Sequence, residues 1–163
     1  LVLQEPFLYH GTITSNIRMY HEELTEAEIR QAAAFVDVAD FIESLPGGYN
    51  HPVTERGSTL STGQRQLLAF ARTIAAQPKI LILDEATANI DQETEEMIQN
   101  SLKKMRQGRT TIAIAHRLST IQDADCIYVL DKGKIIESGN HDQLIALGGT
   151  YKKMYDLQAG MMK

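Results

Sequence analysis

The sequence lacks the features that mark secreted, membrane-spanning and nucleic-acid-binding proteins. Its single cysteine, Cys126, excludes an internal disulfide framework and fits a reducing compartment. No apolar run approaches the roughly 20 residues that span a bilayer, and the opening residues carry no basic leader. The 16 Lys and Arg residues against 21 Asp and Glu give a net charge of −5. This balance argues against nucleic acid as a partner, since phosphate binding needs a basic face.

The length of 163 residues and the 43% of hydrophobic residues predict one globular domain with a core of its own. The first residue is not Met, and the chain opens in what reads as the middle of a strand (residues 1–3). We therefore expect this sequence to be a piece of a longer one.

Strand and helix patterns alternate along most of the chain, which is typical of an α/β fold with a parallel sheet. The run 80–83 is apolar at every position, which predicts a strand buried on both faces of a parallel sheet. Residues 110–115 and 126–130 predict a second and a third buried strand. Capping boxes, in which a polar residue is followed three positions later by Glu or Gln, predict helix starts at Thr25, Ser61 and Asn140. Asp91 is expected to cap a further helix, and residues 131–137 to form a hairpin. Residues 12–60 contain helices but no buried strand, and we expect a helical insertion there.

Polar side chains follow three of the predicted strands, at the point where each strand ends. They are Gln4, the pair Asp84 and Glu85, and His116. Ligands bind outside the carboxyl ends of the strands in open parallel sheets. An amide, two carboxylates and an imidazole suit a hydrated Mg²⁺ ion and an activated water. Each residue also has a structural interpretation: the acids could cap the next turn, and a lone histidine at a strand end is more often structural.

The segment Leu60-Ser61-Thr62-Gly63-Gln64 begins a predicted helix. Ser61 and Gln64 form an ordinary capping box, which is sufficient to explain both residues. The same geometry, with a serine hydroxyl and a bare glycine at a helix N-terminus, also makes an anion site. The two interpretations are compatible.

In this order and spacing, the residues resemble the nucleotide-binding domain of an ABC transporter. Leu60 to Gln64 resembles the signature motif, with Thr62 in place of the usual first glycine. The other matching motifs are the glutamine loop at Gln4, the Walker B strand with its following glutamate at 80–85, the D-loop at 88–91 and the switch histidine at His116. Thr54-Glu55-Arg56-Gly57 resembles the loop that touches the membrane domain's coupling helices in exporters.

The resemblance implies a P-loop NTPase (RecA-like) fold, an α/β parallel-sheet core that here lacks its N-terminal strands. It implies a helical signature subdomain at about 12–76, with 1–11 and 77–163 as parts of the core of a partial ATP-binding domain. The family's phosphate-cradling Gly-x-x-x-x-Gly-Lys-[Ser/Thr] motif, Walker A, occurs nowhere in these residues. We therefore expect the chain alone to be inactive.

The resemblance also implies a mechanism in which two such domains, identical or different, enclose two ATP molecules. Asp84 and Gln4 would hold Mg²⁺, Glu85 would be the general base, and His116 would contact the γ-phosphate. The groups implied to touch nucleotide or the dimer seam are Ser61, Thr62, Gly63, Gln64 and Asp91. Thr62 could crowd the phosphate and slow turnover, or change nothing.

The implied function is the ATPase of an exporter, placed at the cytoplasmic face of the membrane through the transporter's transmembrane domains, which it would contact near Thr54 to Gly57. The transported substrate is open. One alternative is a catalytically silent piece that only binds or dimerises. A DNA-repair ATPase is disfavoured by the short interval between Gln4 and Ser61, and a translation-factor relative by Thr54 to Gly57.

Overall fold

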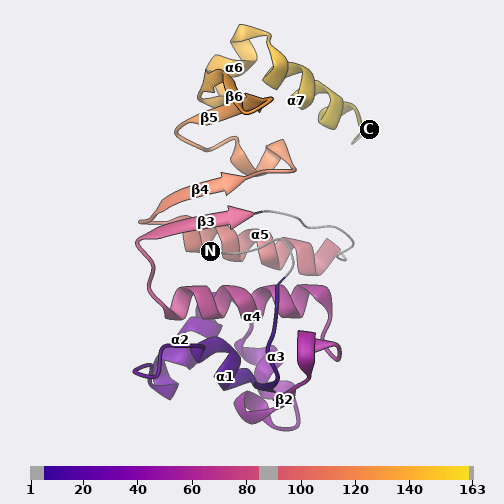
Figure 1. Cartoon of the computed structure of the whole chain (residues 1–163). Helices are drawn as coiled ribbons and strands as arrows, with labels where there is room; N and C mark the ends of the chain where they lie inside the picture. Colours follow the sequence, from indigo (N-terminus) through magenta and orange to yellow (C-terminus); the bar gives the residue numbers. More distant parts are fainter. Residues whose placement is uncertain (1–5, 85–91, 162–163) are drawn as a thin grey trace. The chain divides into compact units, whose positions relative to one another are not determined.

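The computed structural model describes residues 6–84 and 92–161, without the side chains at 55, 92, 93 and 161. The chain forms two compact units, Leu1–Ile114 and Ala115–Lys163, and each is described by itself. Figure 1 follows the path of the chain through each unit. The predicted strand at 1–3, and the residues Gln4, Glu85 and Asp91, lie outside the described residues.

The first unit combines a group of helices with a parallel pair of strands. Its elements are β1 (Gly11–Thr12), α1 (Ile13–Arg18), α2 (Glu26–Phe35), α3 (Ala39–Ser44), η1 (Gly48–Asn50), β2 (Pro52–Val53), η2 (Glu55–Gly57), α4 (Thr62–Ala75), β3 (Ile80–Asp84), α5 (Gln92–Arg106) and β4 (Thr110–Ile114). Strands β3 and β4 pair in parallel from Ile80↔Thr110 to Asp84↔Ile114, and β1 pairs antiparallel with β2.

The second unit is built on an antiparallel hairpin. Its elements are η3 (Leu118–Ile121), β5 (Ile127–Asp131), β6 (Lys134–Gly139), α6 (His141–Leu147) and α7 (Thr150–Met161). Strands β5 and β6 pair around the predicted turn. The buried side chains that form the core of this unit are Leu118, Ile127, Val129, Leu144 and Tyr151.

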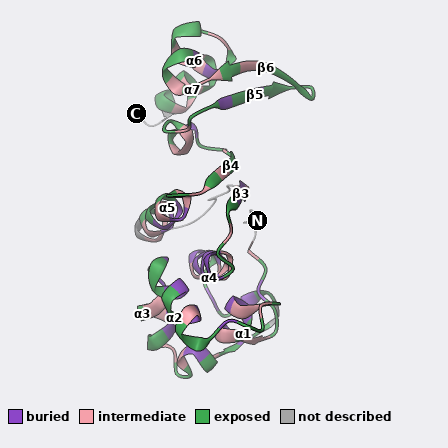
Figure 2. Cartoon of the chain, turned by 90° about the vertical axis from the view of Figure 1, so that its left-hand side faces the viewer, coloured by how far each residue is buried: buried purple, intermediate pink, exposed green. Residues whose placement is uncertain are grey.

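Helix α4 is the central element of the first unit. It packs against α1, α2 and α5, and Figure 2 shows its buried residues in purple. Its apolar residues recur at helical spacing, so Leu67, Phe70, Ala71 and Ile74 are buried together. The helix therefore has a fixed position, and its first turn is held with it.

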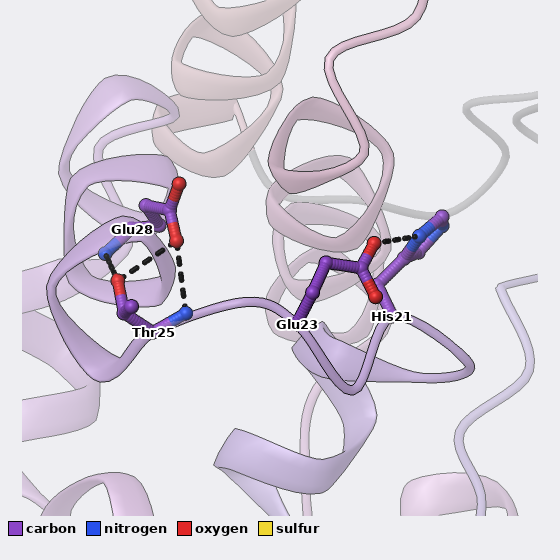
Figure 3. A network of polar contacts seen from close by, with 4 residues as sticks. All are labelled: His21, Glu23, Thr25 and Glu28. Atoms are coloured by element: carbon purple, nitrogen blue, oxygen red, sulfur yellow. Dashed lines mark hydrogen bonds and ion pairs between the residues drawn. The ribbon is translucent and has the colours of Figure 1, made fainter.

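Among the residues that the structure describes, helices begin with a capping box at Thr12, Thr25, Ser61 and Asn140. Three of these starts were predicted and are confirmed. At Thr25 the hydroxyl accepts the amide of Glu28, and the Glu28 carboxylate accepts the Thr25 amide at 2.9 Å (Figure 3). The same view shows the exposed contact of His21 with Glu23 at 3.1 Å. The box at Thr12 uses Ser15 in place of Glu or Gln, which explains why the sequence pattern missed it.

The predictions that 80–83 is buried on both faces and that 110–115 is a buried strand were wrong for this chain. Leu81 and Leu83 are buried in one core cluster with residues of α5, whereas Ile80 and Ile82 are 59% and 40% exposed. Ile112 and Ile114 on β4 are each 56% exposed. Among the described residues, helices cover one face of this strand pair, and the other presents four isoleucines.

The run at 126–130 was also expected to be a buried strand. It forms β5, which pairs antiparallel with β6 and buries only Ile127 and Val129, while Tyr128 and Leu130 are exposed. Burial on alternate positions is what an antiparallel hairpin with one covered face produces. The apolar run alone did not distinguish this arrangement from a central parallel strand.

Candidate nucleotide site

The signature segment lies at the N-terminus of α4, a helix of 14 residues. The Ser61 hydroxyl accepts the amide of Gln64 at 3.2 Å, and the Gln64 side chain accepts the amide of Ser61 at 2.9 Å. The amides of Thr62 and Gly63, at the first two helical positions, have no partner inside the helix. A helix N-terminus of this kind favours anions, because its amides and its dipole both present positive charge.

Arg65 fixes the first turn from the side. Its guanidinium donates to the carbonyl of Leu60 at 2.6 Å and to the hydroxyl of Thr62 at 3.0 Å. The Thr62 side chain is exposed but engaged by this contact. Sequence reasoning missed Arg65, and its position one turn after Thr62 was the only signal available.

The loop at Thr54 to Gly57 leads directly into the signature. Arg56 donates its amide to the carbonyl of Leu8 at 3.0 Å, and Leu60 donates its amide to the carbonyl of Gly57 at 2.9 Å. Gly57 has φ +60°, and a Cβ atom there would lie 2.9 Å from Leu8 Cδ1 and 3.2 Å from Arg65 Cδ. Residues of three segments therefore meet at Gly57, where a larger residue would have to displace the side chains of Leu8 and Arg65.

Asp84 is the last residue of β3, opposite Ile114 on β4, and is partly exposed. This is the carboxyl end of the parallel pair, where the predicted Mg²⁺ ligand was expected. Glu85 follows outside the described residues, as does Gln4. Residues 6–84 and 92–161 contain no cluster of three or more metal-ligating His, Cys, Asp or Glu side chains. One carboxylate at this edge still fits Mg²⁺, which usually takes one or two protein carboxylates together with substrate phosphates and water.

His116 lies in the second unit, just after β4, and is exposed. Its carbonyl accepts from the side-chain amide of Gln158 at 2.9 Å, and Gln158 also accepts the amide of Leu118 at 2.9 Å. Helix α7 thus holds the main chain on both sides of Arg117. His116 therefore belongs to a different unit from Asp84 and Ser61.

Electrostatic shifts are found away from these residues. The pKa of Glu137 is lowered because its carboxylate accepts the amides of Tyr151 and Thr150 at the start of α7. The pKa of Glu28 is lowered by the amide of Thr25 in the capping box of α2. Both carboxylates serve helix ends, and neither belongs to the candidate site.

The chain matches known proteins over nearly its whole length. The ABC transporter family profile matches residues 2–88. A putative ABC transporter ATP-binding protein, exp8, of Streptococcus pneumoniae is 75% identical over 162 residues, which are 99% of this chain and 28% of that protein. A probable multidrug resistance ABC transporter ATP-binding/permease protein, YheH, of Bacillus subtilis is 57% identical over 160 residues, 98% of this chain and 24% of that protein.

A solved structure of a bacterial Atm1-family ABC exporter with ATP bound superposes with a TM-score of 0.86 at 44% identity, covering 97% of this chain and 28% of that one. The chain thus spans about a quarter of the length of these proteins. Its fold is that of the ABC ATPase, a P-loop NTPase with mixed helices and a parallel sheet, as the motifs predicted. By the match of the family profile to more than half of its residues, the chain belongs to the ABC transporter family.

Proposed function

We propose that this chain is the signature and Walker B part of the ATP-binding domain of an ABC exporter, and that the domain hydrolyses ATP to drive transport. The observation that carries the proposal is the N-terminus of α4, where a capped first turn begins inside the motif Leu60 to Gln64. Its relatives support the proposal, since they include a multidrug resistance ATP-binding/permease protein and an exporter with bound ATP.

Of the proposed catalytic groups, Asp84 ends β3, at the carboxyl end of the parallel strand pair. Asp84 and Gln4 would hold Mg²⁺, and Glu85 would polarise the water that attacks the γ-phosphate. Mg²⁺, when bound, neutralises charge on the phosphates. His116 contacts the γ-phosphate and keeps the attack in line. Asp91 couples the two domains across their interface.

The signature acts on nucleotide held by a second ATP-binding domain. Ser61, Thr62, Gly63 and Gln64 face that phosphate, and the amides in the first turn of α4 supply the positive end of the helix dipole. Walker A is absent from these 163 residues, so the groups described act on a phosphate that another segment cradles. The second domain is identical or a homologue.

Thr54 to Gly57 form the proposed contact with the transporter's transmembrane domains. The 3₁₀ helix η2 lies in this loop and leads into the signature through the Leu60–Gly57 hydrogen bond. No helix among the described residues is long and apolar enough to cross a membrane. We place the domain at the cytoplasmic face of the membrane, held there by those transmembrane domains.

A second candidate function is a silent piece that binds or dimerises without catalysis. The exposed isoleucines of β3 and β4 favour it for the isolated chain, because such a face promotes association. This second function does not explain the motif residues that follow the strands. We therefore propose it only for the isolated 163-residue chain.

The test is Glu85→Gln in the intact transporter. We expect ATP binding to persist while steady-state hydrolysis falls by roughly 10²–10⁴-fold, which is what a general base contributes. Glu96→Gln, the same substitution on the exposed side of α5, is the matched control and should leave hydrolysis unchanged. Hydrolysis by Glu85→Gln near the wild-type rate would show that Glu85 is not the base.

A further inference from the structure

A buried polar junction joins the segment after Gln4 to helix α4. Asn16 on α1 is 1% exposed. Its side-chain carbonyl accepts the amide of Tyr9 at 2.8 Å, and its side-chain amide donates to the carbonyls of Tyr9 at 2.9 Å and Thr12 at 3.0 Å. One side chain thus holds the main chain at residues 9 and 12.

Arg72 on α4 completes the junction from a position 56 residues away in sequence. Its guanidinium donates to the carbonyl of Asn16 at 2.7 Å, to the Asn16 side chain at 3.1 Å and to the carbonyl of Phe7 at 3.0 Å. The guanidinium carbon also lies 5.8 Å from the centre of the Tyr9 ring. All three nitrogens of the guanidinium therefore have partners in the segment from Phe7 to Asn16.

Packing alone does not explain this junction, because removing a charged side chain from water costs free energy. Arg72 is partly buried, and desolvation lowers its pKa. A guanidinium that stays charged in such a place needs hydrogen-bond partners. An apolar residue at this position on α4 would pack without that requirement. What the arginine adds is a fixed geometry, because its planar fork engages two separate main-chain segments at once.

Resting on the proposed function, we infer that Arg72 and Asn16 are positioning residues that tie the main chain following Gln4 to the helix that carries the signature. The carbonyl of Phe7 is three residues beyond Gln4, and Arg72 stands on the helix that starts at the signature. The link therefore fixes the segment from Phe7 to Asn16 against the helix that carries the signature. Loss of the link leaves the residues of each motif unchanged but frees this segment from α4.

The experiment measures ATPase rate against ATP concentration for Arg72→Gln in the intact transporter. We expect kcat to fall between about 10-fold and 100-fold, the effect of a small misplacement of reacting groups. KM for ATP should change by less than about twofold, because uniform binding of ATP is unaffected. Arg72→Lys keeps the charge and one donor, and should give an intermediate kcat; it also serves if Arg72→Gln does not fold.

The control is a buried hydrogen bond of the same unit that does not reach the segment from 7 to 16. Ser101 is fully buried and donates its hydroxyl to the carbonyl of Val36 at 3.0 Å. Ser101→Ala should lower thermal stability and leave kcat per folded molecule unchanged. Asn16→Ala combined with Arg72→Gln should reduce kcat no further than the more damaging single change, since both break one link.

The possible failures are distinguishable. If the unaltered transporter does not hydrolyse ATP, the proposed function is overturned and this inference with it. If it hydrolyses ATP, and Arg72→Gln and Arg72→Lys keep the wild-type kcat, only the inference is overturned. An equal loss of kcat in Ser101→Ala, or independent effects of the two changes in the double variant, also contradicts the positioning role.

Discussion

At the first turn of α4, the Arg65 guanidinium donates a hydrogen bond of 3.0 Å to the Thr62 hydroxyl. The threonine side chain is therefore engaged by a residue of its own helix. A glycine at this position, usual in the family that the sequence resembles, makes no such contact. The same guanidinium holds the carbonyl of Leu60 at 2.6 Å. The Thr62 side chain, which we expected either to crowd a phosphate or to change nothing, therefore has a partner for its hydroxyl within the chain.

Thr62→Gly tests whether this side chain affects turnover. Because Arg65 engages the hydroxyl, we expect the ATPase rate of the intact transporter to stay within about twofold of wild type. Stability should fall by only about 0.5 kcal/mol, from the greater backbone freedom of glycine. Steady-state hydrolysis and thermal unfolding measure the two effects. A several-fold rise in turnover would show that Thr62 crowds the phosphate.

Gly57→Ala tests the close approach beside the signature. The change should lower the free energy of unfolding by about 2–4 kcal/mol, because a left-handed alanine costs about 1–2 kcal/mol and the new Cβ meets buried Leu8. Gly48→Ala is the matched control: Gly48 has φ +52° with nothing within 4 Å of a Cβ, so only the backbone cost of about 1–2 kcal/mol applies. Equal losses in urea denaturation would contradict the packing argument.

At the scale of elements, helix starts were predictable because their signals are local. Thr25, Ser61 and Asn140 each carry a partner three residues later, and the structure confirms all three boxes. The faces of β3 and β5 were not predictable in the same way. An apolar run shows that a strand can be buried on both faces, but which face is covered depends on elements elsewhere in the chain.

Helix α7 depends on a residue outside it. The Glu137 carboxylate on β6 accepts the amides of Tyr151 and Thr150, and these bonds lower its pKa. A carboxyl whose pKa is lower in the folded state stabilises the fold above its unfolded pKa, and loses that effect as pH falls through the folded pKa. The stabilisation is therefore fully present at neutral pH and absent in acid.

Glu137→Gln should accordingly lower the melting temperature at pH 7. The difference from wild type should shrink as the pH is lowered, because the wild-type carboxyl is protonated in acid and no longer favours the amides. Glu22→Gln, at an exposed loop position, is the control and should show no such pH dependence. A difference between wild type and Glu137→Gln that is constant with pH would show that the cap does not act through its charge.

At the scale of the whole molecule, the features that could not be predicted from the sequence are contacts between residues far apart in the chain. The motif order predicted the family and the kind of site, and the comparisons confirmed the family and the fold. The junction of Arg72 with Asn16 and the close packing of Leu8 on Gly57 join segments far apart in sequence, with no local signal. The residue roles at Gln4, Asp84, Glu85 and His116 stay predictions.

The strand pair β3–β4 also bears on the behaviour of the whole chain. Its four exposed isoleucines form a contiguous apolar face beside an unpaired strand edge among the described residues. Such faces and edges promote association. We therefore expect the 163-residue chain, studied alone, to be marginally stable or self-associated.

The central claim is that this chain carries groups that act on a nucleotide cradled by another segment. Calorimetric titration of the chain with MgATP tests it most directly, with sedimentation velocity on the same sample to record its state of association. The account predicts very weak binding, no ATP hydrolysis, and a chain that is associated or only marginally folded. A monodisperse monomer that binds MgATP with an affinity on the order of micromolar, about −8 kcal/mol, would contradict it, because these residues would then build a complete nucleotide site of their own.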